Sequence, residues 1–176
     1  MATGASIMYV KELIDKKPWT GPVIDLGAGK ESKFYEGYFA GHEYIRLDNA
    51  EQANARTDII ADILNMPQVK SNFYGVVLLL DVLEHLCDPF LAFHEAARIL
   101  RPRGLFICTT VASWPEHKHP FDFYRFMPDG MTYLCVRTGL QPYATGYRTY
   151  GQGSGITVAV GAIKMEKQNE NPHPLL

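Results

Sequence analysis

Pro22-Val23-Ile24-Asp25-Leu26-Gly27-Ala28-Gly29-Lys30-Glu31-Ser32 is the stretch of sequence that decides the fold. Its apolar residues form a short run bounded by proline and glycine, which predicts a buried parallel strand. Gly27 and Gly29 predict a sharp turn directly after this strand, because glycine adopts backbone angles that other residues avoid and places no Cβ beside a ligand. Parallel α/β sheets bind ligands at the carboxyl ends of their strands. We therefore expect a ligand at this turn, the alternative being a turn that serves the fold alone.

The residues around the turn favour one class of ligand. A dinucleotide-binding fingerprint has a third glycine where this chain has Ser32, and it places an anionic pyrophosphate on a helix N-terminus. Asp25, two residues before the first glycine, suits a cationic ligand better than a phosphate. S-adenosylmethionine (SAM) carries a sulfonium and an ammonium group and no phosphate. The run Asp25-Leu26-Gly27-Ala28-Gly29 resembles motif I of class I SAM-dependent methyltransferases.

Length and composition indicate an ordinary globular domain. The chain has 176 residues, 47% hydrophobic and 20% charged, and a net charge of −2, which provides no general attraction for nucleic acid or an anionic membrane. Its three cysteines form no C-x-x-C pair, so we expect neither a disulfide framework nor a zinc ribbon, and we expect Cys108 and Cys135 to be buried thiols. The N-terminus does not resemble a signal peptide and no apolar run has membrane-spanning length, so we expect a cytoplasmic protein.

Periodicity predicts alternating helices and strands. A leading helix is expected over residues 6–17 and a short helix over 31–40, with Phe34, Tyr35, Tyr38 and Phe39 on its apolar side. Further helices are expected over 90–100, begun by Pro89 and burying Leu91, Ala92, Ala96, Ile99 and Leu100, and over 131–138. Strands are expected over 42–48, 58–63, 73–80 and 105–111, and residues 141–150 and 155–164 predict an antiparallel hairpin. Residues 112–128 are expected to be irregular.

Two acidic residues after the turn are candidates for nucleoside contacts. Asp48 ends the second strand, 23 residues after Asp25, where a carboxylate accepts hydrogen bonds from both ribose hydroxyls. The alternative is that Asp48 caps a following helix. Asp62 could hold the adenine amine, with Ile63 against the ring, or it could cap a helix before Pro67.

Polar residues near the fourth strand and in the irregular segment are candidates for acceptor chemistry. His85 follows the fourth strand and is either a general base or a histidine that orders its loop. His117, His119 and Asp122 are suitable metal ligands, but we interpret them as acceptor-loop residues and expect no metal. Tyr124 and Arg125 either bind an acidic or sugar acceptor or hold the loop in place.

Read together, these segments resemble the class I SAM methyltransferases, specifically the type-11-like group, over roughly residues 23–164. Beyond motif I and Asp48, the resemblance rests on Ala61-Asp62-Ile63 with Met66-Pro67, and on Asp81-Val82-Leu83-Glu84-His85 with Asp88-Pro89. Residues 96–104 (AARILRPRG) resemble the helix and turn that lead into the fifth strand. Residues 119–126 (HPFDFYRF) resemble a segment of a bacterial branch of the group, some of whose members are linked to glycan biosynthesis.

The resemblance implies a Rossmann-like, doubly wound α/β fold with a seven-stranded, mostly parallel sheet and an antiparallel C-terminal hairpin strand. Length, periodicity and composition predict one domain over residues 1–164, with a leading helix within 1–21 and a disordered tail over 165–176, which is polar and has two prolines. The implied cofactor is SAM, with S-adenosylhomocysteine as product. It is expected to contact Asp25, Gly27, Ala28, Gly29, Asp48, Asp62, Ile63 and Asp81.

The candidate catalytic residues are His85, His119 and Asp122, and the candidate acceptor-binding residues are His117, Tyr124 and Arg125. The sequence departs from the group at Glu31, where many members carry a third glycine and where a carboxylate adds negative charge near the ammonium of the methionine moiety. The segment before the first strand is short, so the cleft is expected to be open or closed by a second subunit in a homodimer.

Three functions are compatible with these residues. The first is a SAM-dependent methyltransferase acting on a small-molecule or glycan-like acceptor. The second is a nicotinamide-dependent oxidoreductase, which Asp25, Ser32 and the terminal hairpin argue against. The third is a non-catalytic subunit that keeps the fold, with or without SAM. A retained cofactor site without turnover on any acceptor would distinguish the third function from the first.

Overall fold

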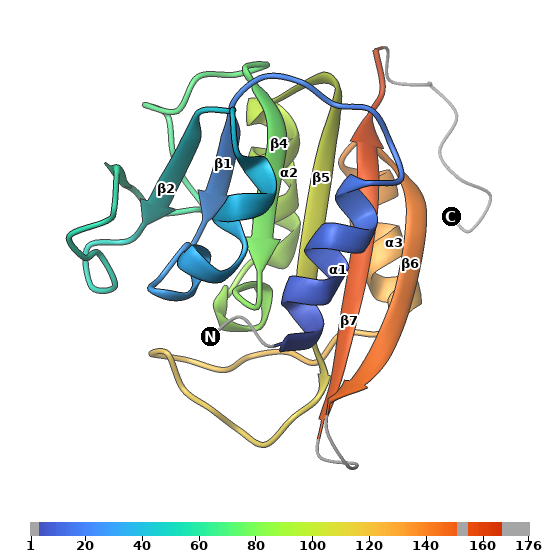
Figure 1. The fold of residues 1–176 in the computed structure, drawn as a ribbon. Coiled ribbons are helices and arrows are strands. Elements are labelled where there is room, and N and C mark those ends of the chain that lie inside the picture. The colour runs from blue at the N-terminus through green and yellow to red at the C-terminus, as the bar shows by residue number, and fades with distance from the viewer. Residues whose placement is uncertain (1–3, 151–154, 167–176) are drawn as a thin grey trace.

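The computed structural model describes residues 4–150 and 155–166, and within them the strands form one sheet in the order β3-β2-β1-β4-β5-β7-β6 (Figure 1). The strands are β1 (Val23–Leu26), β2 (Tyr44–Asp48), β3 (Ile59–Ile60), β4 (Tyr74–Leu80), β5 (Leu100–Ser113), β6 (Leu140–Tyr150) and β7 (Gly155–Lys164). The helices are α1 (Gly4–Ile14), α2 (Pro89–Ile99) and α3 (Pro128–Arg137), with 3-10 turns η1 (Glu31–Phe34), η2 (Glu36–Phe39) and η3 (Leu83–His85).

The sheet is parallel from β3 to β5 and antiparallel where β7 enters it. β1 pairs in parallel with β2 and β4, and β4 pairs in parallel with β5. β7 runs antiparallel to both β5 and β6. The predicted fold class, a seven-stranded and mostly parallel sheet with an antiparallel C-terminal hairpin strand, is therefore confirmed.

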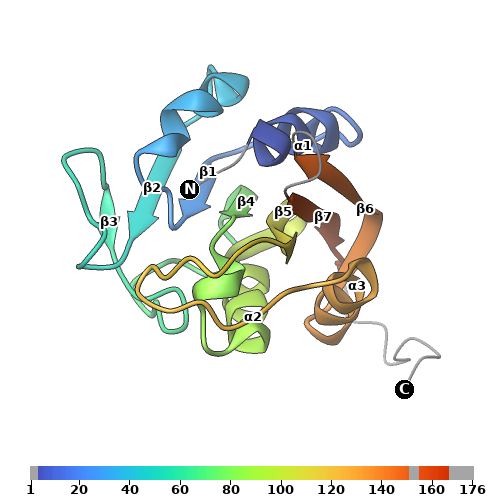
Figure 2. The same ribbon diagram turned by 90° about the horizontal axis from the view of Figure 1, so that it is seen from below.

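Helices cover both faces of the sheet and enclose two hydrophobic clusters. α1 lies on one face with η1 and η2, while α2 and α3 lie on the other (Figure 2). The cluster on the α1 face contains Val10, Leu13 and Phe39, and the cluster on the opposite face contains Phe93 and Phe106. All seven residues of β4 are buried because this central strand is covered on both sides, as its continuous apolar run predicts.

The helix predicted over residues 31–40 is wrong: this segment forms the two short turns η1 and η2. Tyr35, between them, leaves helical geometry at φ −130°, and Gly37 has low helix propensity. Tyr35 and Phe39 are buried as expected, but Phe34 and Tyr38 are exposed. Two separate turns bury only the side chains that face the sheet, so one continuous apolar side never forms.

Two other expectations need correction. The strand predicted over 58–63 pairs only over Ile59 and Ile60, because the chain leaves the edge of the sheet after them. α2 begins at Pro89 with Asp88 as its N-cap, accepting a hydrogen bond from the Leu91 amide at 2.9 Å. Leu91 itself is exposed and Phe93 is buried in its place.

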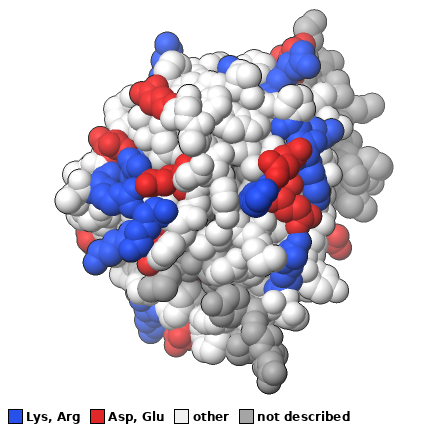
Figure 3. All heavy atoms as spheres, in the orientation of Figure 1, with Lys and Arg blue, Asp and Glu red and all other residues white. Residues whose placement is uncertain are grey.

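The remaining whole-chain expectations concern charge, thiols and the tail. Positive and negative side chains are interspersed on the face that carries α1 (Figure 3). Cys108 and Cys135 are buried free thiols, as predicted, and Cys87 is exposed. None of the described helices has both the length and the apolar character that crossing a bilayer requires. The predicted disordered tail lies, from residue 167 onward, outside the described residues.

Candidate functional site

A cavity of about 400 Å³ opens at the carboxyl ends of β1, β2 and β4. This is the edge of the sheet where parallel α/β folds bind ligands. The loop that follows β5 runs beneath the same ends of the strands (Figure 1). The cavity is lined by Gly27, Ala28, Gly29, Lys30, Glu31, Tyr35, Asp48, Asn49, Gln52, Asp62, Ile63, Leu80, Asp81, Val82, His85, Leu86, His119 and Pro120.

The glycine turn forms one wall of the cavity. Gly27 and Gly29 have φ angles of +74° and +54°, in the region that favours glycine. The Gly27 amide donates to the carbonyl of Leu47 at 2.8 Å, and the Gly29 amide donates to a carboxylate oxygen of Asp48 at 3.0 Å. The turn after β1 is therefore fastened to the end of β2.

Asp48 is 5% exposed and lies where the cavity meets β2. Besides the Gly29 amide, its carboxylate accepts a hydrogen bond from the Asn49 amide at 3.1 Å. Burial raises its pKa despite these two hydrogen bonds. The alternative that Asp48 caps a helix does not hold, because the Gln52 amide at the following turn donates to the side chain of Asn49 instead.

Asp62 and Ile63 lie together on the cavity wall beyond β3. The carboxylate of Asp62 accepts a hydrogen bond from the Leu64 amide at 2.9 Å, so it also orders its own loop. Ile63 is buried, with 6% of its surface exposed. The cavity wall therefore has a carboxylate and an apolar side chain next to each other at this point.

Asp25 was predicted to contact a cationic ligand, but the structure places it behind the cavity wall. Its carboxylate is 1% exposed and accepts hydrogen bonds from the hydroxyls of Tyr35 and Tyr44, each at 2.9 Å. Its other oxygen has no hydrogen-bond partner in the part of the chain that the structure describes. Desolvation by burial raises the pKa of Asp25 to about 7. Tyr35, which the sequence did not single out as a site residue, lines the cavity in its place.

The raised pKa of Asp25 predicts how stability depends on pH. An unfolded aspartate titrates near pH 4, so a pKa of about 7 means that the folded chain holds this proton more tightly. Its contribution is complete below the unfolded pKa and is lost as the pH rises through the folded pKa. Between about pH 4 and pH 7 the free energy of unfolding should therefore fall, by at most about 1.4 kcal/mol per pH unit.

Asp25→Asn should remove this slope, since the amide stays neutral and still accepts hydrogen bonds from the tyrosines. The measurement is urea unfolding of the wild type and the variant in the same series of buffers. As the pH rises, the free energy of unfolding of the wild type should fall relative to that of the variant. If the free energies of unfolding of the two proteins depend on pH in the same way, Asp25 does not have the raised pKa.

Asp81 joins three elements beneath the cavity. It adopts a positive φ of +53° directly after β4. Its carboxylate accepts hydrogen bonds from the Ser6 hydroxyl on α1 at 2.7 Å and from the Thr109 hydroxyl on β5 at 2.9 Å. Asp81 is 4% exposed and lines the cavity, so α1 is fixed to the site through it.

His85, on η3, has its ring oriented by the loop after β5. Its Nδ1 lies 2.6 Å from the carbonyl of Phe121, and its Nε2 is buried without a hydrogen-bond partner in residues 4–150 and 155–166. Burial lowers the pKa of His85. The ring of His119 lies 5.7 Å from that of His85, and both residues line the cavity.

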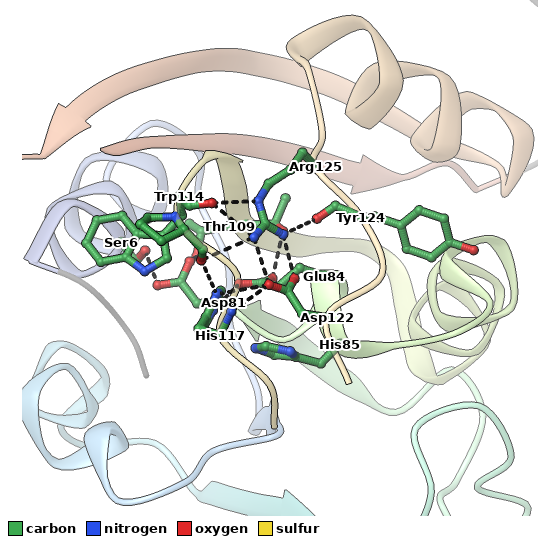
Figure 4. A network of polar contacts seen from close by, with 12 residues as sticks. Ser6, Asp81, Glu84, His85, Thr109, Trp114, His117, Asp122, Tyr124 and Arg125 are labelled. Atoms are coloured by element: carbon green, nitrogen blue, oxygen red, sulfur yellow. Dashed lines mark hydrogen bonds and ion pairs between the residues drawn. The ribbon is translucent and has the colours of Figure 1, made fainter. Parts of the chain in front are cut away.

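The loop is held by the residues predicted to bind an acceptor (Figure 4). Arg125 pairs with both carboxylate oxygens of Asp122 and donates to the carbonyl of Trp114. The hydroxyl of Tyr124 donates to the carbonyl of Cys87 at 3.0 Å. The Arg125 hydrogen bonds hold the pKa of Asp122 well below its usual range. None of these side chains lines the cavity, so the geometry favours the alternative in which they hold the loop in place.

Glu84 was not singled out by the sequence, although it stands inside the segment Asp81–His85. Its side chain is fully buried, and one carboxylate oxygen accepts a hydrogen bond from the Thr110 hydroxyl at 2.7 Å. Burial and the nearby charge of Asp81 raise the pKa of Glu84 to about 7. The signal in the sequence was a third polar residue, between Asp81 and His85, in the segment directly after a buried strand.

Comparisons with known proteins agree with this geometry. The model of a methyltransferase domain family, type 11, matches residues 24–108, which run from β1 into β5. No curated protein sequence matches the chain. Residues 24–108 therefore provide the sequence-level match, and they include the glycine turn, Asp48 and His85.

Solved structures extend the similarity to most of the chain. A chain in the complex between the Trm112 methyltransferase activator and a methyltransferase of Haloferax volcanii has 16% identity and a TM-score of 0.67, and the match covers 90% of this chain and 89% of that one. The Burkholderia thailandensis 1,6-didemethyltoxoflavin-N1-methyltransferase, solved with S-adenosylhomocysteine, has 16% identity and a TM-score of 0.68, covering 92% and 77%.

The Haemonchus contortus phosphoethanolamine N-methyltransferase 2, in complex with SAM, has 13% identity and a TM-score of 0.70; the match covers 92% of this chain and 52% of that one. At these identities the likeness establishes the fold. The predicted resemblance to the class I SAM-dependent methyltransferases of the type-11-like group is confirmed.

Proposed function

We propose that this chain is a SAM-dependent methyltransferase that acts on a small-molecule or glycan-like acceptor. One observation carries the proposal. The cavity at the carboxyl ends of β1, β2 and β4 brings together the glycine turn, Asp48 and the Asp62–Ile63 pair. These are the residues that the resemblance to the type-11-like group assigns to the cofactor. The matched family segment, residues 24–108, contains all of them.

The residues present fit an adenosyl group. A Cβ at Gly27 would lie 2.6 Å from a methyl group of Val82, so only glycine lets the turn pack on Val82, and both residues line the cavity. We assign Asp48 to the ribose hydroxyls, because its carboxylate lies on the cavity beside the turn. We assign Asp62 to the adenine amine and Ile63 to the adenine ring face. Asp81 lines the other part of the cavity, toward η3.

The acceptor end of the cavity is formed by His85, His119 and Pro120. SAM, when bound, supplies a methyl group on a good leaving group, so alignment and exclusion of water account for much of the catalysis. A hydroxyl acceptor must also lose its proton, and the two imidazoles are the groups placed to receive it. We assign Asp122 and Arg125 to positioning, since their ion pair holds the loop that carries His119.

The proposal includes the domain organisation and the cellular compartment expected from the sequence. We propose a single domain over residues 1–164, working in a reducing compartment such as the cytoplasm. Two of its thiols are buried and one is exposed, and none of the three is paired. Ser32 is fully buried at the position of the third glycine of a dinucleotide fingerprint, which argues against a nicotinamide cofactor.

The test is calorimetric titration of the purified chain with SAM, S-adenosylhomocysteine and NAD. Binding of the first two at micromolar concentrations or below, with no heat from NAD, is the expected result. Tight binding of NAD alone would replace the proposal with the oxidoreductase. Absence of adenosyl binding would favour a non-catalytic subunit that keeps the fold.

A further inference from the structure

Glu84, His85 and His117 form a cluster whose possible ligand atoms all lie within 4.8 Å of one another. Glu84 and His85 come from η3, directly after β4, and His117 comes from the loop after β5 (Figure 4). The two segments are far apart in sequence and are joined here by the contact of His85 with the carbonyl of Phe121.

The carboxylate of Glu84 has one free oxygen, which points into the cluster. Its Oε2 accepts a hydrogen bond from the Thr110 hydroxyl, while its Oε1 is buried and has no hydrogen-bond partner among the described residues. The Nε2 of His117 lies 3.9 Å from this oxygen, too far for a hydrogen bond. A buried polar atom without a partner costs free energy, so a native structure requires a reason to keep one.

Both histidines have the same arrangement of ring nitrogens. The Nδ1 of His85 lies 2.6 Å from the Phe121 carbonyl. The Nδ1 of His117 lies 3.2 Å from the Pro115 carbonyl and 3.3 Å from a carboxylate oxygen of Asp122. Because oxygen acceptors hold a proton on each Nδ1, each Nε2 keeps a lone pair. Metal-binding histidines are oriented by hydrogen bonds of this kind.

We propose that Glu84, His85 and His117 bind one divalent transition-metal ion through the carboxylate Oε1 and the two Nε2 atoms. Two imidazoles and a carboxylate suit Zn²⁺, for which ligand atoms stand about 3.3 Å apart in a tetrahedral site. Binding requires the His117 ring to move closer to Glu84 and His85. A quarter of its side chain is exposed and its loop is not part of the sheet, so the ring has room for this movement.

This ligand set differs from the one that the sequence offered as an alternative, His117 with His119 and Asp122. Asp122 is held by Arg125 and by the His117 amide, so both its oxygens are occupied. Asp122 therefore orients the ring of His117 and does not itself bind the ion. Only His117 belongs to both sets.

Three protein ligands leave one position of a tetrahedral ion open, as in catalytic rather than structural zinc sites. His85 lines the cavity, so the open position faces the acceptor end. Resting on the proposed function, this inference narrows the acceptor to one with an oxygen that a metal ion can coordinate. Coordination lowers the pKa of a hydroxyl, which would leave His85 as a ligand and His119 as the proton acceptor.

The test uses the untagged full chain after treatment with a chelator, titrated with Zn²⁺ and separately with Co²⁺. We expect one ion per chain at micromolar affinity or better, and visible absorption bands of a four-coordinate Co²⁺ complex. Glu84→Gln and His117→Asn should each weaken binding by about 100-fold or more. Thr110→Val, which removes the hydrogen bond that orients Glu84, should weaken it by about 10-fold.

His94→Asn is the matched control, because His94 is exposed on α2 and lies outside the cluster. Circular dichroism and SAM titration of each variant establish that it is folded. Zn²⁺ binding that Glu84→Gln and His117→Asn leave unchanged, or no binding below about 100 μM, would overturn the metal site. SAM binding is scored on the same samples, so failure of the proposed cofactor would be seen separately from failure of the metal site.

Discussion

Gly27→Val is expected to abolish SAM binding and to destabilise the fold. Gly27 has a φ of +74°, which a β-branched residue adopts only with strain. The added Cβ would lie 2.6 Å from one methyl group of Val82 and 3.1 Å from the other, inside van der Waals contact. The two effects together should lower the free energy of unfolding by about 2–4 kcal/mol.

The binding effect has its own cause. Relief of the clash must move the turn or Val82, and both line the cavity where the proposal places the cofactor. Calorimetry with SAM should show at least about a 100-fold loss, at a temperature where circular dichroism finds the variant folded. Gly37→Ala is the control, since a Cβ at Gly37 would have no atom of the described residues within 4 Å and Gly37 does not line the cavity. A folded Gly27→Val protein that binds SAM like the wild type would remove the turn from the cofactor site.

The order of the secondary-structure elements could be predicted from the sequence because each element carries a local signal. β4 is a continuous apolar run, and α2 has a proline at its start and an aspartate N-cap. The prediction of one helix over residues 31–40 was wrong, although the spacing of the aromatic residues suggests a single apolar face. The backbone leaves helical geometry at Tyr35 and forms two separate 3-10 turns. Periodicity contains no information on such a break.

The candidate site was predictable where it follows the ends of strands and not where it depends on the path of a loop. Gly27, Asp48 and Ile63 reach one cavity because parallel strands end at one edge of the sheet. Whether Asp25 faces a ligand depends on Tyr35, which lies between η1 and η2 and donates a hydrogen bond to the Asp25 carboxylate. Glu84 and His117 lie more than thirty residues apart in the sequence, and only the tertiary path of the loop brings them within 4 Å of each other.

Asp48→Ala is expected to weaken SAM binding by about 100-fold or more while leaving the chain folded. Under the proposed assignment, the carboxylate accepts two hydrogen bonds from ribose hydroxyls, and hydrogen bonds to a charged group contribute about 1.5–3 kcal/mol each. The substitution also leaves the amides of Gly29 and Asn49 without their acceptor, which loosens the turn on which the cofactor rests.

Calorimetry with SAM and with S-adenosylhomocysteine checks this expectation, and both should lose affinity alike because they share the ribose. Asp48→Asn should lose less than Asp48→Ala, since an amide oxygen still accepts a hydrogen bond but without the charge. Asp15→Ala is the control, because Asp15 is an exposed carboxylate that pairs with Lys11 of α1. Equal affinities for wild type and Asp48→Ala would show that Asp48 serves the turn alone, and the ribose would then have to be held by another group on the cavity wall.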